Sequence, residues 1–174
     1  ASNWRTYHTS LGATKAVVLD GAEAAQTFNF WQDTAPTSSV FYLSSHGDAN
    51  GSGNDIVGYC FHSVDGFSKF GSYTGNGNAD GSFIYTGFRP AFILSKRTDS
   101  AGDWHMYDVE RDTYNVTYKA IWANYRNAEY LSYSAVWDVL SNGFKARTSS
   151  AIVNSGTYIY MAFAENPFKY SNAR

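Results

Sequence analysis

The chain has 174 residues, which is enough for one domain with a sizeable core and short for two. Hydrophobic residues make up 44% of it, charged residues only 16%, and the formal net charge is −2. The hydrophobic content excludes a disordered chain, and the weak, scattered charge excludes a surface built to attract nucleic acid. No apolar run is long enough to span a bilayer, so we expect no membrane insertion.

Aromatic residues make up 18% of the chain, and such residues favour the half-buried surface of a β-sheet. Short aromatic and β-branched runs alternate with turns rich in Gly, Asn and Ser, a pattern that predicts an all-β fold with two antiparallel sheets, a β-sandwich or jelly roll. The strands expected in chain order are residues 16–19, 40–44, 56–62, 67–73, 83–88, 91–96, 104–108, 114–120, 143–148 and 157–164.

Helical signal is thin, and at most one or two short helices are expected. Residues 22–30 favour a turn or two of helix, and residues 134–140 favour a short helix. The pair Asn142-Gly143 then suits a left-handed stop or a tight turn.

The last predicted strand, residues 157–164, alternates clearly. Tyr158 and Tyr160 share one face, whereas Ile159, Met161 and Phe163 share the other. We expect the aliphatic face to enter the core. The tyrosine face is interpreted as a second core, a subunit contact or a binding surface.

Cys60 is the only cysteine, so no disulfide can form within the chain. It lies in an apolar run that reads as a strand, and the sequence favours a buried small hydrophobe over a reactive thiol. Stability is therefore expected from packing, subunit contacts or bound ions.

Two polar, glycine-rich loops lie between strands, residues 46–55 and residues 75–82. In the second, Asn76, Asn78 and Asp80 alternate before a glycine, as in the first half of a calcium loop. The bidentate Glu of such a loop is absent, because Gly87 holds its position. An Asn- and Gly-rich β-turn explains the same residues, so a calcium site and a plain turn are the two alternatives, and no other cofactor is predicted.

Three carboxylates alternate at Asp108, Glu110 and Asp112, and they would share one face if the strand continued. Paired carboxylates can hydrolyse glycosides, but the Glu-x-Asp-x-x-Glu spacing of sandwich-fold hydrolases is missing, so charge pairs with nearby arginines are favoured. No nucleophile elbow, phosphate loop or dinucleotide fingerprint appears, and no enzyme is predicted. The histidines, which show no metal-ligand spacing, are His8, His46, His62 and His105.

Flat aromatic side chains with polar edges bind sugars and build interfaces at low entropic cost. The core is the alternative for each of them. As candidates for ligand contact we single out Trp104, Tyr73 and Tyr85, together with the 75–82 loop.

A set of long, ordered motifs resembles a domain of unknown function that is common in tail and fibre proteins of tailed phages, especially marine ones. The resemblance runs from about Trp4 to the C-terminus. It is carried by residues 66–92, residues 96–99 with Trp104, and residues 108–111, 140–145 and 160–168.

The resemblance implies a concanavalin-like or jelly-roll sandwich, residues 1–174 forming one domain at the C-terminal end of a longer virion protein. The first residue is Ala1, so we expect a processed chain or a fragment. The implied role is host-surface attachment, with glycan as ligand, on the virion or outside the cell. Expected partners are further copies of the chain, with a trimer as one option, or other tail proteins. The alternatives are a purely structural, self-assembling module and a glycan-degrading enzyme.

Overall fold

The computed structural model describes residues 3–112, 114–131 and 136–167, and nearly all of its regular structure is β. Among these residues the one helix is a single short turn, α1 (Gly47–Asn50). The strands are β1 (Arg5–Thr6), β2 (Lys15–Val18), β3 (Gln26–Thr27), β4 (Ser68–Thr74), β5 (Phe83–Tyr85), β6 (Pro90–Arg97), β7 (Trp104–Asp108), β8 (Ile121–Trp122), β9 (Trp137–Leu140), β10 (Gly143–Ala146) and β11 (Thr157–Ala164).

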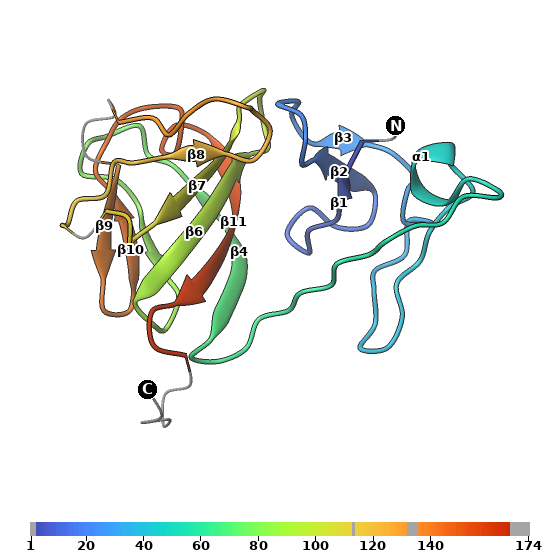
Figure 1. The fold of residues 1–174 in the computed structure, drawn as a ribbon, viewed down its shortest axis with the longest axis horizontal. Coiled ribbons are helices and arrows are strands. Elements are labelled where there is room, and N and C mark those ends of the chain that lie inside the picture. The colour runs from blue at the N-terminus through green and yellow to red at the C-terminus, as the bar shows by residue number, and fades with distance from the viewer. Residues whose placement is uncertain (1–2, 113, 132–135, 168–174) are drawn as a thin grey trace.

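Two antiparallel sheets face each other and form a β-sandwich (Figure 1). The larger sheet has the strand order β4-β11-β6-β7-β8, and the smaller has the order β5-β10-β9. A third, small sheet, β1-β2-β3, belongs to the N-terminal part and lies beside the larger sheet (Figure 1). The expected all-β sandwich is thus confirmed.

The main core fills the space between the two large sheets. Trp137 and Phe144 of the smaller sheet are fully buried there, with ring centroids 4.8 Å apart in an edge-on contact. From the larger sheet Tyr107 and Tyr160 join the same cluster. Burying such large rings is the dominant stabilising term of this sandwich, because each removes about 150–250 Å² from water.

The aliphatic face of β11 was expected to enter the core, but its tyrosine face does so instead. Tyr160 points into the sandwich core, and Tyr158 stacks on Tyr73 with centroids 4.9 Å apart. Ile159 and Met161 point outward, where a second apolar cluster covers them. The tyrosine face therefore forms the main core, which explains why both faces of this strand carry large side chains.

The N-terminal part covers part of the larger sheet's outer face. Val17 of β2 packs with Leu94, Ile159 and Trp104 of that sheet. The indole nitrogen of Trp104 donates a 2.7 Å hydrogen bond to the Val18 carbonyl oxygen. These contacts fix the small sheet against the sandwich.

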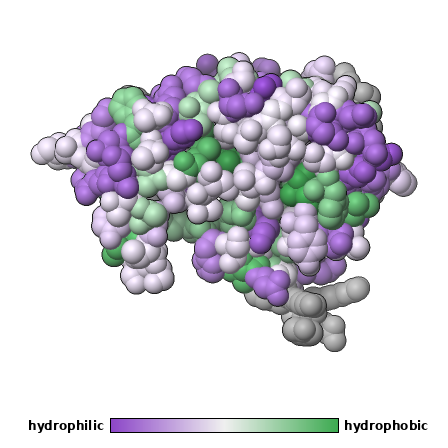
Figure 2. Space-filling view, turned by 180° about the vertical axis from the view of Figure 1, so that it is seen from behind, coloured by the Kyte–Doolittle hydropathy of each residue, from purple (hydrophilic) through white to green (hydrophobic). Residues whose placement is uncertain are grey.

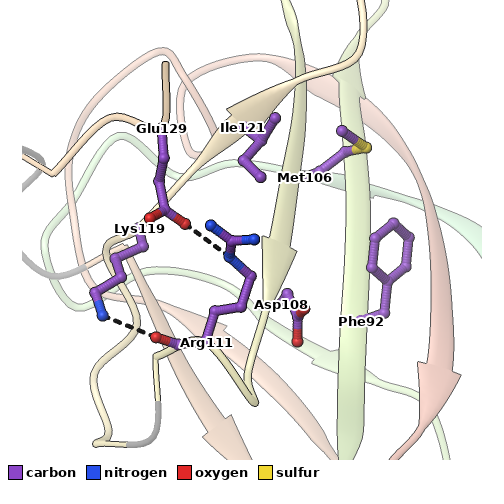
Figure 3. Close-up of a pocket in the computed structure, with 7 residues that line it drawn as sticks. All are labelled: Phe92, Met106, Asp108, Arg111, Lys119, Ile121 and Glu129. Atoms are coloured by element: carbon purple, nitrogen blue, oxygen red, sulfur yellow. Dashed lines mark hydrogen bonds and ion pairs between the residues drawn. The ribbon is translucent and has the colours of Figure 1, made fainter.

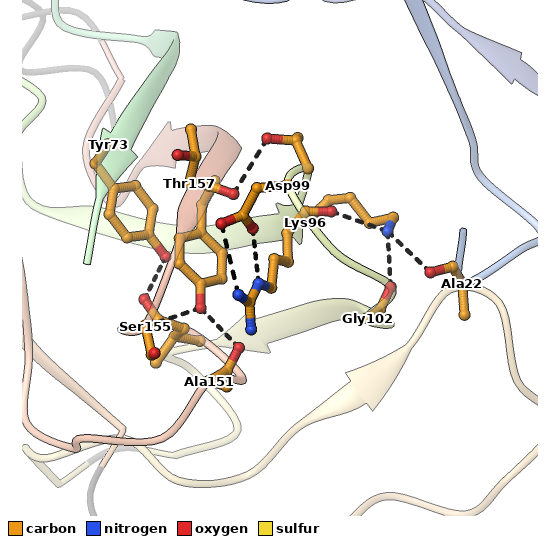
Figure 4. Close-up of polar contacts among 12 residues, drawn as sticks. Ala22, Tyr73, Lys96, Asp99, Gly102, Ala151, Ser155 and Thr157 are labelled. Atoms are coloured by element: carbon orange, nitrogen blue, oxygen red, sulfur yellow. Dashed lines mark hydrogen bonds and ion pairs between the residues drawn. The ribbon is translucent and has the colours of Figure 1, made fainter. Parts of the chain in front are cut away.

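Lys96 adds a polar anchor at the same junction. Its side chain is fully buried, and its ammonium group donates to four backbone carbonyl oxygens within 3.3 Å (Figure 4). These oxygens belong to Ala22 and Glu23 of the N-terminal part and to Arg97 and Gly102 of the sandwich. Burial lowers the Lys96 pKa to about 8, and the carboxylates of Asp103 and Glu23 oppose that shift.

Most strand predictions are confirmed, and three are wrong. No strand forms at residues 40–44 or 56–62, and residues 114–120 contribute only isolated bridges at Thr117 and Ala120. All three runs have strand-like composition, but no strand pairs with residues 40–44 or 56–62, and residues 114–120 pair only at single positions, Thr117 with Trp137 and Ala120 with Tyr130. Composition reports that a residue fits a sheet, not that a partner strand exists.

The helix predictions are also wrong where the structure describes them. Residues 22–30 contain the short strand β3, and residues 137–140 form β9. The rest of the second run, Ser134 and Ala135, lies outside the described residues. Trp137 and Val139 are fully buried and alternate with the half-buried Asp138 and Leu140, which is strand periodicity. No described helix has the length and apolar character needed to cross a bilayer.

Cys60 corrects a further prediction, because its side chain is exposed. The expectation of burial depended on residues 56–62 forming a core strand. Since that strand does not form, the thiol lies on the surface.

Candidate functional site: an exposed aromatic sheet face

Two aromatic rings stand on the outer face of the smaller sheet. In β5, Ile84 is buried in the sandwich core, so its neighbours Phe83 and Tyr85 point to the opposite side. Tyr85 is 64% exposed and Phe83 is 45% exposed. Side chains two residues apart on a strand share one face, so these rings form one aromatic surface, which we call the Tyr85 face.

A glycine gives this surface its shape. Gly143 of β10 pairs with Tyr85 in the sheet register. A Cβ atom at Gly143 would lie 2.1 Å from the Ile84 carbonyl oxygen and 3.0 Å from the Phe83 ring. A larger residue does not fit at this position. Because Gly143 has no side chain, the Phe83 ring can pack directly over its backbone.

Charged groups border the rings. Lys145 of β10 pairs in register with Phe83 on one side and Asp138 of β9 on the other. The Lys145 ammonium group forms a 2.7 Å ion pair with Asp80, which lowers the pKa of that carboxyl. The Asp138 carboxylate accepts a hydrogen bond from the Asn115 amide. The Tyr85 face thus combines flat apolar rings with fixed polar groups in one row.

The three predicted contact residues differ in how accessible they are in the structure. Tyr85 is exposed and stays a candidate. Trp104 is 4% exposed, with its indole nitrogen bonded to Val18, so neither ring face is open to a ligand. The Tyr73 hydroxyl donates to the Val153 carbonyl oxygen, and burial raises the Tyr73 pKa well above its ordinary value. Both side chains serve packing, and we do not retain them as contact residues.

Sequence reasoning missed Phe83, Lys145 and Asp138. Residues 83–88 carry large side chains on both faces of the strand, so the sequence pattern could not show which face meets the core. The register with β10, which places Lys145 beside Phe83, depends on pairing between strands 60 residues apart in sequence, and no local pattern encodes it.

The outer face of the larger sheet carries a shallow hollow of about 130 Å³ (Figure 3). Its apolar floor is formed by Phe92, Met106 and Ile121. Arg111 and Glu129 bridge its rim with a 3.0 Å ion pair. The hollow is smaller than the ~300–1,000 Å³ typical of small-molecule sites. Besides the Arg111–Glu129 pair, Lys119 donates to the Arg111 carbonyl oxygen.

The predicted carboxylate row does not form. β7 ends at Asp108, whose carboxylate accepts from the Glu110 backbone, and the chain then turns. Asp112 is buried, and its carboxylate accepts from the backbone nitrogens of Tyr118 and Lys119. The expected arginine pairing is also wrong, because the acidic partners are Glu165 for Arg89, Asp99 for Arg97 and Glu129 for Arg111.

The 75–82 loop is a hydrogen-bonded turn. The Asn76 side-chain oxygen accepts from the Asn78 backbone, and the Asn78 side-chain oxygen accepts from the Asp80 backbone. Buried Asn154 fastens the loop by donating to the Asn78 carbonyl oxygen at 2.6 Å and accepting from the Asn76 backbone at 3.1 Å. The oxygens that were candidate calcium ligands thus have protein partners. In the described part of the chain, no three His, Cys, Asp or Glu side chains gather as a metal site.

The histidines hold different positions. His46 accepts from the Asp48 backbone at the start of α1, and His62 is exposed. His105 is buried in the sandwich, where desolvation lowers its pKa to about 4. His8 is also buried, and desolvation lowers its pKa as well.

Viewed from the side opposite Figure 1, the surface shows several separate apolar patches among hydrophilic residues rather than one continuous apolar area (Figure 2).

The fold and this face define a β-sandwich protein with an exposed aromatic and polar sheet surface. A family model, the domain of unknown function DUF7483, matches residues 1–167, so the chain belongs to that family. No curated protein and no solved structure matches the chain.

Proposed function

We propose that this chain is a non-catalytic, glycan-binding attachment module of a tailed-phage tail or fibre, and that the Tyr85 face is its contact surface. The observation that carries the proposal is the pair of exposed rings, Phe83 and Tyr85, beside fixed charged groups on one sheet face. The phage assignment is supported by the resemblance of the motifs to tail and fibre domains.

The chemistry of the face suits a sugar. The carbon–hydrogen faces of a pyranose ring are apolar and pack against flat aromatic rings, while its hydroxyl groups require hydrogen-bond partners. Lys145 and Asp138 stand in the same row as Phe83 and supply a donor and an acceptor. Tyr85 adds a phenolic hydroxyl at the edge of its ring.

The absence of catalysis in this proposal is supported by the fate of the carboxylates. A glycosidase needs two carboxyl groups about 5–10 Å apart with room for the sugar between them. Asp112 is buried and bonded to backbone nitrogens, and Asp108 accepts from the Glu110 backbone. Asp108 lines the hollow on the other sheet, and the two carboxylates at the Tyr85 face, Asp138 and Asp80, are bonded to Asn115 and Lys145.

A glycan array probed with the 174-residue chain tests the proposal. We expect binding to a restricted set of glycans that is lost in Tyr85→Ala and in Phe83→Ala. Tyr125→Ala is the matched control, because Tyr125 is a 52% exposed tyrosine outside this face. If the folded chain binds no glycan, or if binding survives both replacements, the proposal is wrong.

A further inference from the structure

The outer surface of the smaller sheet is organised in two rows that run across its strands. In one row, Lys145 pairs in register with Phe83 on one side and with Asp138 on the other. In the next row along the strands, Gly143 pairs with Tyr85. The first row therefore carries a ring and two charged side chains, whereas the second carries a ring beside a residue without a side chain.

The two rings follow one another along β5. The Phe83 ring reaches forward over Gly143, because a Cβ atom there would lie 3.0 Å from two of its ring carbons. The Tyr85 ring reaches forward in the same direction to Gly87, where a Cβ atom would lie 3.6 Å from the phenolic oxygen and 3.8 Å from the ring carbon Cζ. Each ring thus leans over a glycine, and together they form a line of two rings, which we call the ring strip.

Fixed charged groups stand at one end of the ring strip. The Asn115 amide group is held by two hydrogen bonds with the Val139 backbone, of 2.8 Å and 3.2 Å, and it donates to the Asp138 carboxylate. A lysine ammonium group has three donors, and that of Lys145 gives one to Asp80. Both groups are therefore held in position and keep hydrogen-bonding capacity for a hydroxyl group.

The row of Tyr85 is apolar apart from the tyrosine hydroxyl. Leu140 of β9 pairs with Gly143 on the side away from Tyr85. Its side chain lies on the outer side of the sheet, because its neighbours Trp137 and Val139 enter the core. The ring strip is thus polar and charged at one end and mainly apolar at the other.

We propose that the Tyr85 face binds two linked sugars of one glycan chain, laid along β5 with one sugar on each ring. This inference rests on the proposed glycan binding and defines the smallest unit that fills the face, a disaccharide. Positions two residues apart on a strand are separated by about 6.8 Å, a spacing on the scale of one pyranose unit in a chain. The sugar on Phe83 exchanges hydrogen bonds with Lys145 and Asp138, and the sugar on Tyr85 adds contact area.

The two positions differ in selectivity. Fixed charged groups reject a sugar whose hydroxyl groups point the wrong way, because those groups are then left without partners in the contact. A ring beside an aliphatic side chain accepts any sugar with an apolar face, and Leu140 favours one that carries a methyl group, as in a deoxy or acetylated sugar. The sugar on Phe83 therefore sets the identity of the ligand, and the sugar on Tyr85 makes affinity depend on chain length.

The test compares the monosaccharides and disaccharides prepared from the strongest array glycan, each titrated into the 174-residue chain and followed by NMR, which measures millimolar affinities. We expect the best disaccharide to bind at least about fivefold more tightly than the best monosaccharide, because a second ring enters the contact. Equal affinities overturn the inference and leave the glycan proposal standing. A folded chain that binds no array glycan overturns both, so the two failures are distinct.

Two variants separate the positions. Tyr85→Ala should lower the affinity for the disaccharide to that for the monosaccharide and leave the monosaccharide affinity unchanged. Lys145→Gln should weaken both by the same factor, at least about fivefold, because it acts on the sugar that they share. Lys15→Gln, at an exposed lysine of β2, is the control and leaves both affinities unchanged.

Circular dichroism confirms that the variants fold. Weaker monosaccharide binding in folded Tyr85→Ala would overturn the division into two positions. A Lys145→Gln effect confined to the disaccharide would overturn it equally, because the charged end would then not belong to the first sugar.

Discussion

The indole nitrogen of Trp104 donates a 2.7 Å hydrogen bond to the carbonyl oxygen of Val18, 86 residues earlier in the chain. The bond is buried and joins the N-terminal sheet to the sandwich. It also explains why this tryptophan, a candidate sugar platform by its chemistry, is packed inside. The same ring cannot both close this junction and stack on a ligand.

Trp104→Phe tests that assignment. The replacement keeps an aromatic ring in the cluster with Val17 and Ile159 but removes the short indole hydrogen bond, which leaves the Val18 carbonyl oxygen only the longer, 3.4 Å bond from the Gly21 backbone nitrogen. We expect a loss of about 1–3 kcal/mol in the free energy of unfolding, measured with urea, and unchanged glycan affinity. Trp4→Phe, at a 50% exposed ring, is the control with little effect. Reduced glycan affinity in folded Trp104→Phe would contradict the assignment.

Asn154→Ala is expected to loosen the 75–82 loop. The side chain is fully buried and bonds to Asn76, Asn78 and Thr148, so its removal leaves several backbone groups unpaired. We expect a loss of about 3 kcal/mol in unfolding free energy and faster amide exchange in the loop. Asn50→Ala, at an exposed position, is the control. Equal stability of the two variants would show that the loop does not depend on this anchor.

Calcium is expected to leave the melting temperature unchanged. The side-chain oxygens of Asn76 and Asn78 already accept backbone hydrogen bonds, and Asp80 is paired with Lys145. Differential scanning calorimetry with and without calcium measures the effect. A rise in Tm that Asp80→Asn abolishes would establish the loop as a calcium site after all.

Acid should destabilise the sandwich through His105. Its pKa is about 4 in the folded chain and 6.5 in the unfolded chain, because burial disfavours the imidazolium ion. Between these values the unfolded chain binds more protons, so stability is present above pH 6.5 and falls as the pH drops towards 4, by about 3 kcal/mol.

Urea unfolding at several pH values measures this slope. His105→Gln should flatten it, while His62→Gln, at an exposed histidine, should not. The slope should shrink rather than vanish, because His8 is shifted in the same direction. A wild-type slope unchanged by His105→Gln would contradict the assignment.

Lys96 should make the stability of the chain depend on pH in the alkaline range. Its pKa is lowered from 10.5 to about 8 in the folded chain, so the unfolded chain holds the proton more tightly between these values. Stability should therefore rise by about 2 kcal/mol from pH 7 to pH 10. Above pH 10 the raised pKa values of Tyr158 and Tyr160 reverse the trend, because phenols of the unfolded chain ionise first.

Lys96→Met is the matching variant. It should lose that alkaline rise and be less stable at pH 7, since four carbonyl oxygens lose their donor (Figure 4). Lys119→Met, whose ammonium group bonds to one carbonyl oxygen at the surface, should keep the rise. A flat wild-type profile between pH 8 and pH 10 would contradict a buried ammonium group at this junction.

The sequence predicted strands at residues 40–44 and 56–62 that have no partner, and it predicted no strand at β1, β3, β8 or β9, which do pair. Residues 157–164 alternate and form β11 with the same bounds, but alternation could not say which side meets the sandwich core. Residues 56–62 have the same composition as a core strand, and their exposure depends on the absence of a neighbour. Pairing is a long-range property, and this single sequence encodes it only through the whole fold.

The candidate site was only partly predictable for the same reason. Tyr85 was a candidate from its chemistry, and the structure leaves it exposed. Trp104 and Tyr73 have equally suitable chemistry but found buried partners at Val18 and Val153. Side-chain type therefore identifies which residues can bind a sugar, and only the packing decides which of them stay free to do so.

The most direct test of the account is the affinity of the chain for its best array glycan, measured by isothermal titration calorimetry for the wild type, Tyr85→Ala and Tyr125→Ala. Loss of a ring at the centre of a contact costs more than ~1 kcal/mol, so we expect affinity to fall at least about fivefold in Tyr85→Ala. Tyr125→Ala should bind as the wild type does. Equal affinity of Tyr85→Ala and the wild type would contradict the assignment of the Tyr85 face as the attachment surface.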